Sequence, residues 1–396
     1  MAFGAFFNST ASADYGRWLA RYHGWLLAAL WGAVQLICWR HYQGPRLFGD
    51  GLGYISYARQ LAYNEHFAEG HFLRYAGYAA FLSLFLKLRL GLLSMGLAQV
   101  GLSGLAMRAF YRTAWRLGGQ HWPTAALATA VLIGWFEVQA FNSFILTESL
   151  FTSLLLFSLW AVARVKGLGS AALAGGLLLL TALVRPNGFV ALGAGAGAVL
   201  CWLHQAGRLR HPRRLVLLLP VLVPLVWALD KWSVGVLNFM EDYRGGTVIY
   251  NYPQASLTPP AALQMPSGHT SQLSQVVWFV AHNFRYASQL AALRLTYFLG
   301  FPKPWHSPLH IVWLVLTLPA TYWLAIRGVG NRVAALPVRT YLVACLLLQI
   351  SIILVTFEDW DVRFSGPMIP YWLMLAALGA QPGLRRLARR LPGCSG

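Results

Sequence analysis

Residues 169–203 read GSAALAGGLLLLTALVRPNGFVALGAGAGAVLCWL, and this stretch decides the fold class. It is about twice as long as the ~20 apolar residues that one helix needs to cross a bilayer. Arg185-Pro186-Asn187-Gly188 interrupts it near the middle, and Pro and Gly beside Asn are typical of a turn. The stretch therefore predicts two short membrane-spanning helices joined at Arg185.

Further apolar runs of similar length occur along the chain. They cover residues 22–39, 91–107, 123–141, 148–163, 215–230, 308–326, 340–356 and 367–381. Charged residues make up only 11% of the chain and hydrophobic residues 57%, whereas soluble domains have about 25% charged residues. We therefore predict an all-α polytopic membrane protein: a single transmembrane domain over residues 1–396 with about ten transmembrane helices.

Segments outside these runs are expected to lie at the membrane surface. The apolar segment 76–88 would span only roughly 20 Å as a helix, short of the ~30 Å hydrocarbon core, so it is predicted to be re-entrant or interfacial. Two segments between crossings are long enough to fold, 40–90 and 231–307. Within the first, residues 54–63 have the apolar spacing of a helix lying on a membrane.

The net charge of +19 suits either a nucleic-acid partner or an oriented membrane protein. With ten crossings, one face collects 18 of the 31 Lys and Arg residues and a single acid, Asp14; the other holds 13 basic residues and 11 acids. The positive-inside rule places the basic face in the cytoplasm. Both termini are then cytoplasmic, and dispersal of the basic residues over short loops argues against nucleic acid.

The outer acids are the first candidates for a site. Asp50 lies between Gly49 and Gly51, about ten residues beyond the first crossing. It could act as a general base for an acceptor hydroxyl or cap the helix that follows. Glu148, in Thr147-Glu148-Ser149, could belong to the site or be an acid favoured by the helix dipole in a first turn.

Basic residues at the outer margin are candidates for binding phosphate. Arg185 could pair with a phosphate through its planar guanidinium or extend to the lipid headgroups. Arg363 follows three acids in Glu358-Asp359-Trp360-Asp361-Val362-Arg363-Phe364, a segment that could otherwise be an exposed charged loop. Lys303 is a third candidate.

Two other patterns were weighed for alternative chemistry. Glu65, His66, Glu69, His71 and Arg74 form a polar cluster, but their spacing matches no metal motif, and we predict neither a metal nor a cofactor. Pro266-Ser267-Gly268-His269-Thr270 matches the central motif of membrane phosphatidic-acid phosphatases. The Lys-x6-Arg-Pro and Ser-Arg-x5-His-x3-Asp elements of that family are missing, which argues strongly against a phosphatase.

Five motifs, in order over most of residues 20–380, resemble the GT-C superfamily of integral-membrane glycosyltransferases. The resemblance is greatest to the protein O-mannosyltransferase and lipid A aminoarabinose transferase branch. The motifs are Gly49-Asp50 with Tyr57-Ala58 and Leu61; Arg74-x-x-Gly77-Tyr78; Thr147-Glu148-Ser149-Leu150-Phe151; Leu183-Val184-Arg185-Pro186-Asn187-Gly188; and Arg363-Phe364 before Pro367 and Pro370.

The resemblance implies an enzyme of the bacterial inner membrane, in contact with membrane lipid, that takes a sugar from a polyprenyl-phosphate donor. It would pass the sugar to a glycan, glycolipid or protein acceptor at the outer face, with Asp50 as the base. Arg185, Arg363 and Lys303 would bind the donor phosphate. Residues expected to contact substrate are Tyr57, Arg74, Tyr78, Glu148, Asp359 and Asp361.

One departure from the family and one alternative function remain. An acid often follows the catalytic aspartate in the family, whereas Gly51 stands here, which leaves the acceptor class open. A flippase or transporter for lipid-linked sugars is the alternative. A transporter would be expected to place charged groups near the membrane midplane, and here they cluster at the outer margin.

Overall fold

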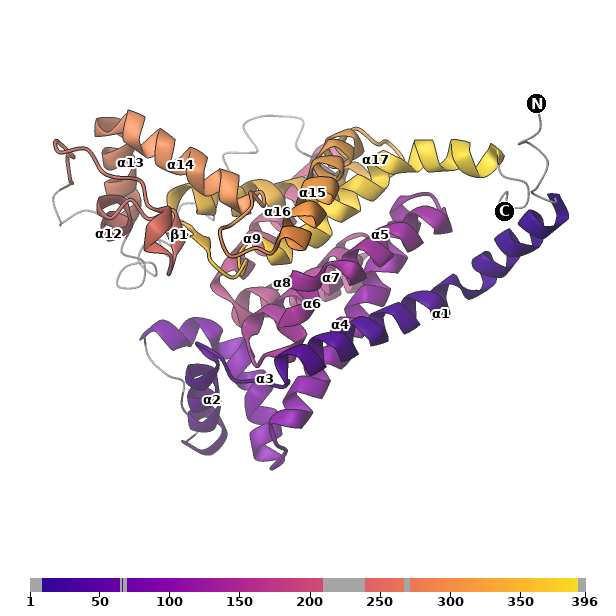
Figure 1. Ribbon diagram of the computed structural model, residues 1–396, viewed down its shortest axis with the longest axis horizontal. Coiled ribbons are helices and arrows are strands. Elements are labelled where there is room, and N and C mark those ends of the chain that lie inside the picture. Colours follow the sequence, from indigo (N-terminus) through magenta and orange to yellow (C-terminus); the bar gives the residue numbers. More distant parts are fainter. Residues whose placement is uncertain (1–8, 65, 67–69, 209–238, 267–270, 391–396) are drawn as a thin grey trace.

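The computed structural model describes residues 9–64, 66, 70–208, 239–266 and 271–390, and these form a nearly all-α protein (Figure 1). The α-helices are α1 (Ser9–Tyr42), α2 (Gly51–Arg59), α3 (Ala76–Lys87), α4 (Leu92–Leu117), α5 (Trp122–Gly134), α6 (Phe136–Ala140), α7 (Thr147–Val162), α8 (Leu168–Val184), α9 (Phe189–Gln205), α12 (Phe239–Arg244), α13 (Gln272–His282), α14 (Phe284–Phe298), α15 (Pro308–Val329), α16 (Leu336–Val355) and α17 (Ile369–Arg390). The two short strands are β1 (Ile249–Tyr250) and β2 (Glu358–Asp359).

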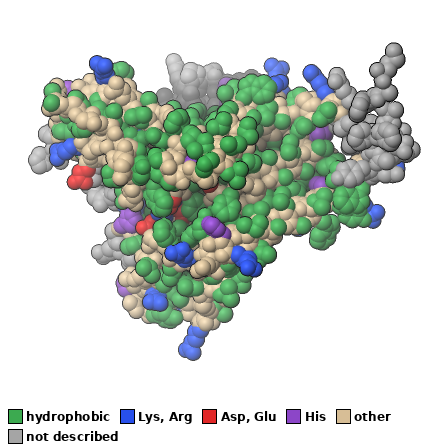
Figure 2. Space-filling model, in the orientation of Figure 1, with side chains coloured by type: hydrophobic (Ala, Val, Ile, Leu, Met, Phe, Trp, Pro, Cys, Tyr) green, Lys and Arg blue, Asp and Glu red, His purple; other side chains and the backbone are tan. Residues whose placement is uncertain are grey.

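Four described helical segments are long and apolar enough to cross a membrane: α4, α15, α16, and α9 together with its preceding turn. A fifth results if α5 and the bent segment after it, at 63°, form one crossing. Helices α7 and α8 are apolar but shorter, and the run predicted at 215–230 lies outside the described residues. Hydrophobic side chains cover most of the face seen in Figure 2, as expected for contact with lipid.

The predicted break at Arg185 is confirmed. Helix α8 ends at Val184, a 3-10 turn covers Pro186–Gly188, and α9 begins at Phe189. Proline cannot donate the hydrogen bond that a continuous helix would require at this point. A Cβ atom at Gly188 would overlap the carbonyl oxygen of Thr181, so glycine allows the turn to fold back against α8.

The run 123–141 differs from the single helix predicted, because it bends by 63° after Gly134. Trp135 between α5 and α6 has a non-helical backbone (φ −77°, ψ 88°). Its indole is buried against Trp313, and its Nε1 donates a hydrogen bond to Glu137 Oε2 at 3.2 Å. Gly134, which precedes Trp135, stabilises a helix poorly, so ending α5 there costs little free energy. The buried indole of Trp135 then fixes the bend.

A buried polar network holds the first helices together beneath the start of α7. Gln35 on α1 donates to Gln139 on α6 at 2.8 Å, and Asn142 donates to Ser103 on α4 at 3.0 Å. Ser149 on α7 donates to Asn142 at 2.5 Å. Hydrogen bonds between helices stabilise membrane bundles modestly but fix their register, and this network sets the position of Glu148, the residue before Ser149.

The two long segments between predicted crossings both fold at one end of the molecule. In Figure 1, α2, α12 and α13 lie at the end opposite the N-terminal end of α1 and the C-terminal end of α17. As predicted, a helix covers much of residues 54–63. In the second segment, helix α13 begins at Gln272. Strand β1 pairs in parallel with β2, joining Ile249 to Glu358, which attaches the second segment to the loop that carries Arg363.

Helices α15 and α17 pack through two glycines. A Cβ atom at Gly379 would overlap the carbonyl oxygen of Leu324, and one at Gly328 would overlap that of Leu375. Small residues at such crossings let helix backbones approach closely in membranes. The close approach fixes α17, and with it the loop that precedes its first turn.

Replacing Gly379 by alanine is therefore expected to destabilise the protein by about 1–3 kcal/mol, the usual cost of overpacking. Thermal unfolding of the purified protein in detergent measures the effect as a lower Tm. Gly383→Ala on the same helix is the matched control, because a Cβ there meets nothing within 4 Å. Equal Tm values for the two variants would contradict the proposed role of Gly379.

Candidate functional site

Four charged side chains from distant parts of the sequence form one continuous network. Arg363 donates from Nη1 to Asp50 Oδ2 at 2.8 Å and from Nε to Glu148 Oε1. Arg185 donates from Nη1 to the same Glu148 oxygen at 2.7 Å. The chain Asp50–Arg363–Glu148–Arg185 contains two acids and two bases, so the network is neutral as a whole.

Exposure changes sharply along this network. The Asp50 side chain is 50% exposed and that of Arg363 16%, whereas Glu148 and Arg185 are 0% and 5% exposed. Solvent or a substrate can therefore reach Asp50 and the edge of Arg363. The inner pair is buried. Removing either partner of a buried ion pair strongly destabilises a protein, because the remaining charge is left uncompensated.

Backbone pairing brings Asp50 to the start of α7. The backbone N–H of Arg46 donates to Ser143 O, and that of Ile145 donates to Arg46 O, both at 2.9 Å. Gly49 then turns the chain with φ +51°, a conformation that favours glycine. These contacts hold the 46–50 segment beside the 143–148 segment, which explains how Asp50 comes to lie near Glu148.

Gly51, where the resembling family often has an acid, has no room for a side chain. A Cβ atom there would lie 2.8 Å from the carbonyl oxygen of Ile145. The first turn of α2 therefore runs directly against the backbone that precedes α7.

Asp50 occupies the N-cap position of α2, but its side chain makes no capping hydrogen bond to the helix and instead binds Arg363. The side-chain part of the capping alternative is therefore wrong. Glu148 lies in the first turn of α7, as its helix-dipole alternative requires. It also binds both arginines. Thr147 precedes it and donates to its second oxygen at 3.3 Å.

Arg185 does not extend toward lipid headgroups, because it is buried and bound to Glu148. Its guanidinium also lies 5.4 Å from the ring centre of Phe364 and 5.8 Å from that of Phe151. These rings stabilise the cation further. Burial would lower the pKa of Arg363, but Glu148 and Asp361 raise it above its usual range, and Arg363 is fully charged.

The first two acids of the loop before Arg363 are buried, so this segment is not the exposed charged loop of the alternative. Glu358 is 0% exposed and Asp359 6%. Lys303 is buried too, and its Nζ donates to the backbone oxygens of Asp359 at 2.8 Å and Trp360 at 3.3 Å. Lys303 therefore holds the loop in place and makes no contact with the four-residue network among the described residues.

Two of the loop acids have raised pKa values. Burial raises the pKa of Glu358 to about 8, although Lys303 acts against this. Burial and the neighbouring Asp359 also raise the pKa of Asp361 well above its usual range. Asp361 precedes Arg363 by two residues, and the two side chains interact electrostatically.

Three residues expected to contact substrate are buried. Tyr57 and Tyr78 are 1% and 0% exposed, and Arg74 is 8% exposed. The Tyr78 hydroxyl donates to Gln99 Oε1 at 2.8 Å. These positions support the packing of α2 and α3, and none of the three side chains is exposed to solvent.

Two patterns seen in the sequence, the first-loop polar cluster and the phosphatase-like motif, fall partly outside the described residues. Glu65 and Glu69 of the first-loop polar cluster do so, and so do Ser267–Thr270 of the phosphatase-like motif. His71 and Arg74 are described, and burial and Arg74 lower the pKa of His71.

Comparison with protein-family models, curated proteins and solved structures finds no match. The case for a function therefore rests on the residues and their geometry.

A second group of polar side chains was missed from the sequence. Glu137 on α6, His306 in the loop before α15 and His310 in its first turn lie together. Together with Phe48, Asp361 and Val362 they line a cavity of about 460 Å³. The spacing of the two histidines, four residues apart, was a visible signal, but their approach to Glu137 depends on the tertiary fold.

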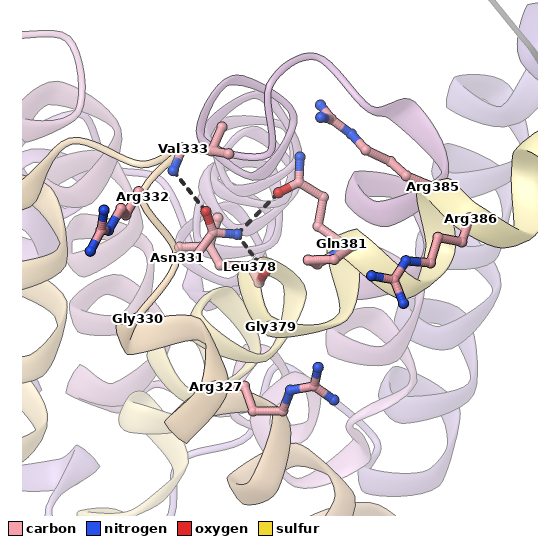
Figure 3. A pocket seen from close by; sticks show the side chains of 11 residues that line it. Arg327, Gly330, Asn331, Arg332, Val333, Leu378, Gly379, Gln381, Arg385 and Arg386 are labelled. Carbon is pink, nitrogen blue, oxygen red and sulfur yellow. Dashed lines mark hydrogen bonds between the residues drawn. The ribbon is translucent and has the colours of Figure 1, made fainter.

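A basic cavity lies far from the network, at the other end of α17. It has a volume of about 520 Å³, and Figure 3 shows Arg327, Arg332, Arg385 and Arg386 around it. Asn331 donates to Leu378 O at 2.7 Å beneath them. Arg363 precedes the first turn of α17, whereas Arg385 lies in its last turns, so the length of this helix separates the two sites.

Proposed function

We propose that this chain is a GT-C-type integral-membrane glycosyltransferase that moves a sugar from a polyprenyl-phosphate donor to an acceptor at the outer face of a bacterial inner membrane. The proposal includes about ten crossings and cytoplasmic termini. One observation carries it: Asp50, half-exposed, binds an arginine whose other partner is the buried Glu148. Charged residues from four of the five family-like motifs thus meet in one network.

The network offers the groups that transfer from a lipid phosphate requires. Asp50 would accept the proton of the acceptor hydroxyl. The acceptor oxygen then forms a bond to the anomeric carbon while the bond from that carbon to the phosphate oxygen breaks. Arg363 and Arg185 would stabilise the charge that develops on the leaving phosphate. A single displacement of this kind inverts the anomeric configuration.

Sharing of Arg363 between two carboxylates suggests how donor and base are coupled. A donor phosphate that binds the exposed edge of Arg363 competes with Asp50 for the same guanidinium. Its arrival would release Asp50 to bind the acceptor hydroxyl. Glu148 remains bound to both arginines and keeps them in place, which fits its complete burial.

The test is a transfer assay with the full chain in lipid vesicles and a panel of radiolabelled polyprenyl-phosphate sugars. Arg363→Gln is expected to weaken donor binding about 10- to 100-fold, because a charge-assisted hydrogen bond contributes about 1.5–3 kcal/mol. Arg285→Gln is the matched control, since Arg285 is exposed on α14. Donor that crosses the vesicle membrane without any product would contradict the proposal and favour a flippase.

A further inference from the structure

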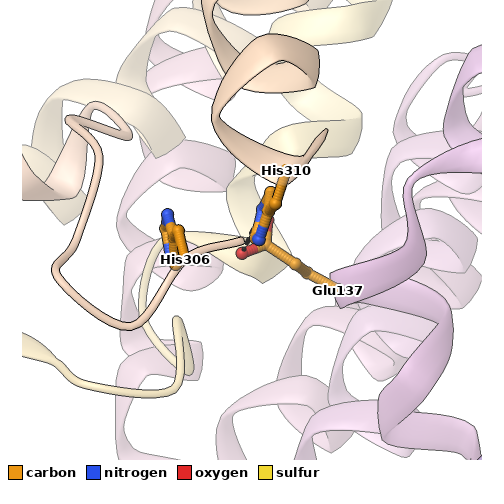
Figure 4. A group of neighbouring side chains, drawn as sticks. All are labelled: Glu137, His306 and His310. Atoms are coloured by element: carbon orange, nitrogen blue, oxygen red, sulfur yellow. Dashed lines mark ion pairs between the residues drawn. The ribbon is translucent and has the colours of Figure 1, made fainter. Parts of the chain in front are cut away.

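Glu137, His306 and His310 offer a set of ligand atoms in one place. One atom from each side chain can be chosen so that all three lie within 4.8 Å of one another. Figure 4 shows His310 and Glu137 meeting, with His306 on the neighbouring loop. His310 Nε2 lies 3.3 Å from Glu137 Oε1, and the two imidazole rings stack with centres 4.1 Å apart.

The surroundings fix one of these ligands. Trp135 Nε1 donates to Glu137 Oε2 at 3.2 Å and leaves Oε1 facing His310 Nε2. Such outer contacts to a ligand side chain orient metal ligands in known sites. Ser307 caps α15 by accepting from the backbone N–H of His310 at 3.3 Å, which holds the backbone that carries this histidine. The backbone N–H of Lys303 also lies 3.3 Å from His306 Nδ1, a long contact that a metal at that nitrogen would replace.

The chemistry of this set indicates which cation it suits. Two imidazoles and one carboxylate match the ligands that Zn²⁺ accepts, whereas Mg²⁺ and Ca²⁺ prefer oxygen ligands alone. Sites with three protein ligands keep a fourth position open for water or substrate. The Glu137 and His310 side chains are 20% and 27% exposed, and they line the 460 Å³ cavity, which leaves room for that fourth ligand.

We propose that Glu137, His306 and His310 form a divalent transition-metal site of the Zn²⁺ class, with its open coordination position toward the cavity. Phe48 and Val362 line the same cavity, and each is close in sequence to a residue of the charged network, Asp50 or Arg363. The site stands independently of the transferase proposal.

The test measures zinc on the full-length protein, purified without a polyhistidine tag and without substrate. After stripping by chelator, incubation with Zn²⁺ and gel filtration, about one zinc per chain is expected. His306→Gln/His310→Gln and Glu137→Gln should each lose at least about 90% of it. His282→Gln is the control, because His282 is exposed and stacks on Trp278. Excess Mg²⁺ should not displace the zinc.

A second measurement needs no variant, in case the double substitution prevents folding. Co²⁺ added to the stripped wild-type protein should give the intense visible absorption of a tetrahedral complex with nitrogen and oxygen ligands, and Zn²⁺ should abolish it. The proposal is overturned if the wild-type protein retains no zinc, if the double variant retains as much as His282→Gln, or if no Co²⁺ band appears.

Discussion

Asp50→Asn is expected to reduce sugar transfer by about 10²–10⁴-fold, the usual contribution of a general base. Asparagine keeps the shape of the side chain but cannot accept the acceptor proton. The Asp50–Arg363 ion pair is half-exposed at its acidic end, so its loss should change stability by less than about 1 kcal/mol. The variant should therefore fold, bind the donor and fail in the chemical step.

Initial rates at saturating donor and acceptor check this result, with donor binding measured on the same preparations. Glu241→Gln is the matched control, because Glu241 is an exposed acid on α12, in the segment 231–307. Full transfer by Asp50→Asn would rule out Asp50 as the base. Loss of donor binding together with transfer would mean that Asp50 acts by positioning Arg363.

Glu148→Gln is expected to have the largest effect on stability. Glu148 is completely buried, and its oxygen Oε1 accepts from both Arg185 and Arg363. Removing its charge leaves Arg185 buried without a counterion, which costs about 3–5 kcal/mol. Thermal unfolding in detergent should show a large fall in Tm, well beyond that of Glu241→Gln.

A double variant separates lost charge balance from lost packing. Glu148→Gln/Arg185→Gln removes both buried charges, and neutralising both partners costs less than stranding one. Its Tm should lie above that of Glu148→Gln alone. If the double variant is instead destabilised relative to the wild type by the sum of the two single effects, the two residues are independent, and the description of a coupled buried pair is wrong.

Local features of the sequence were enough for several elements of the fold. The apolar run 169–203 predicted both helices, and Pro186 and Gly188 predicted the break between them. Both predictions were possible because proline and glycine restrict or release the backbone at their own and adjacent positions. The helix over much of residues 54–63 was predicted from equally local spacing. The bend at Trp135 was missed, since it depends on a contact with Trp313, 178 residues away in the chain.

The candidate site was only partly predictable. Asp50, Glu148, Arg185 and Arg363 were selected as charged residues at the ends of apolar runs and as parts of family-like motifs. The partners of these residues were not predicted from the sequence. Glu148 was expected beside substrate, and in the structure it binds two arginines; its contact with substrate stays a prediction. Lys303 was expected to bind phosphate, which also stays a prediction; in the structure its buried ammonium binds backbone oxygens of a loop, because a buried charge requires acceptors.

Sequence alone determined that this chain is helical, apolar enough for a membrane and divided at Arg185, because those properties follow from the composition and order of neighbouring residues. The tertiary structure alone decided which charges meet. Asp50 and Arg363 lie 313 positions apart, and Glu137 approaches His310 only after the bend at Trp135. Contacts between such distant residues depend on how whole helices pack, and no local pattern records that packing.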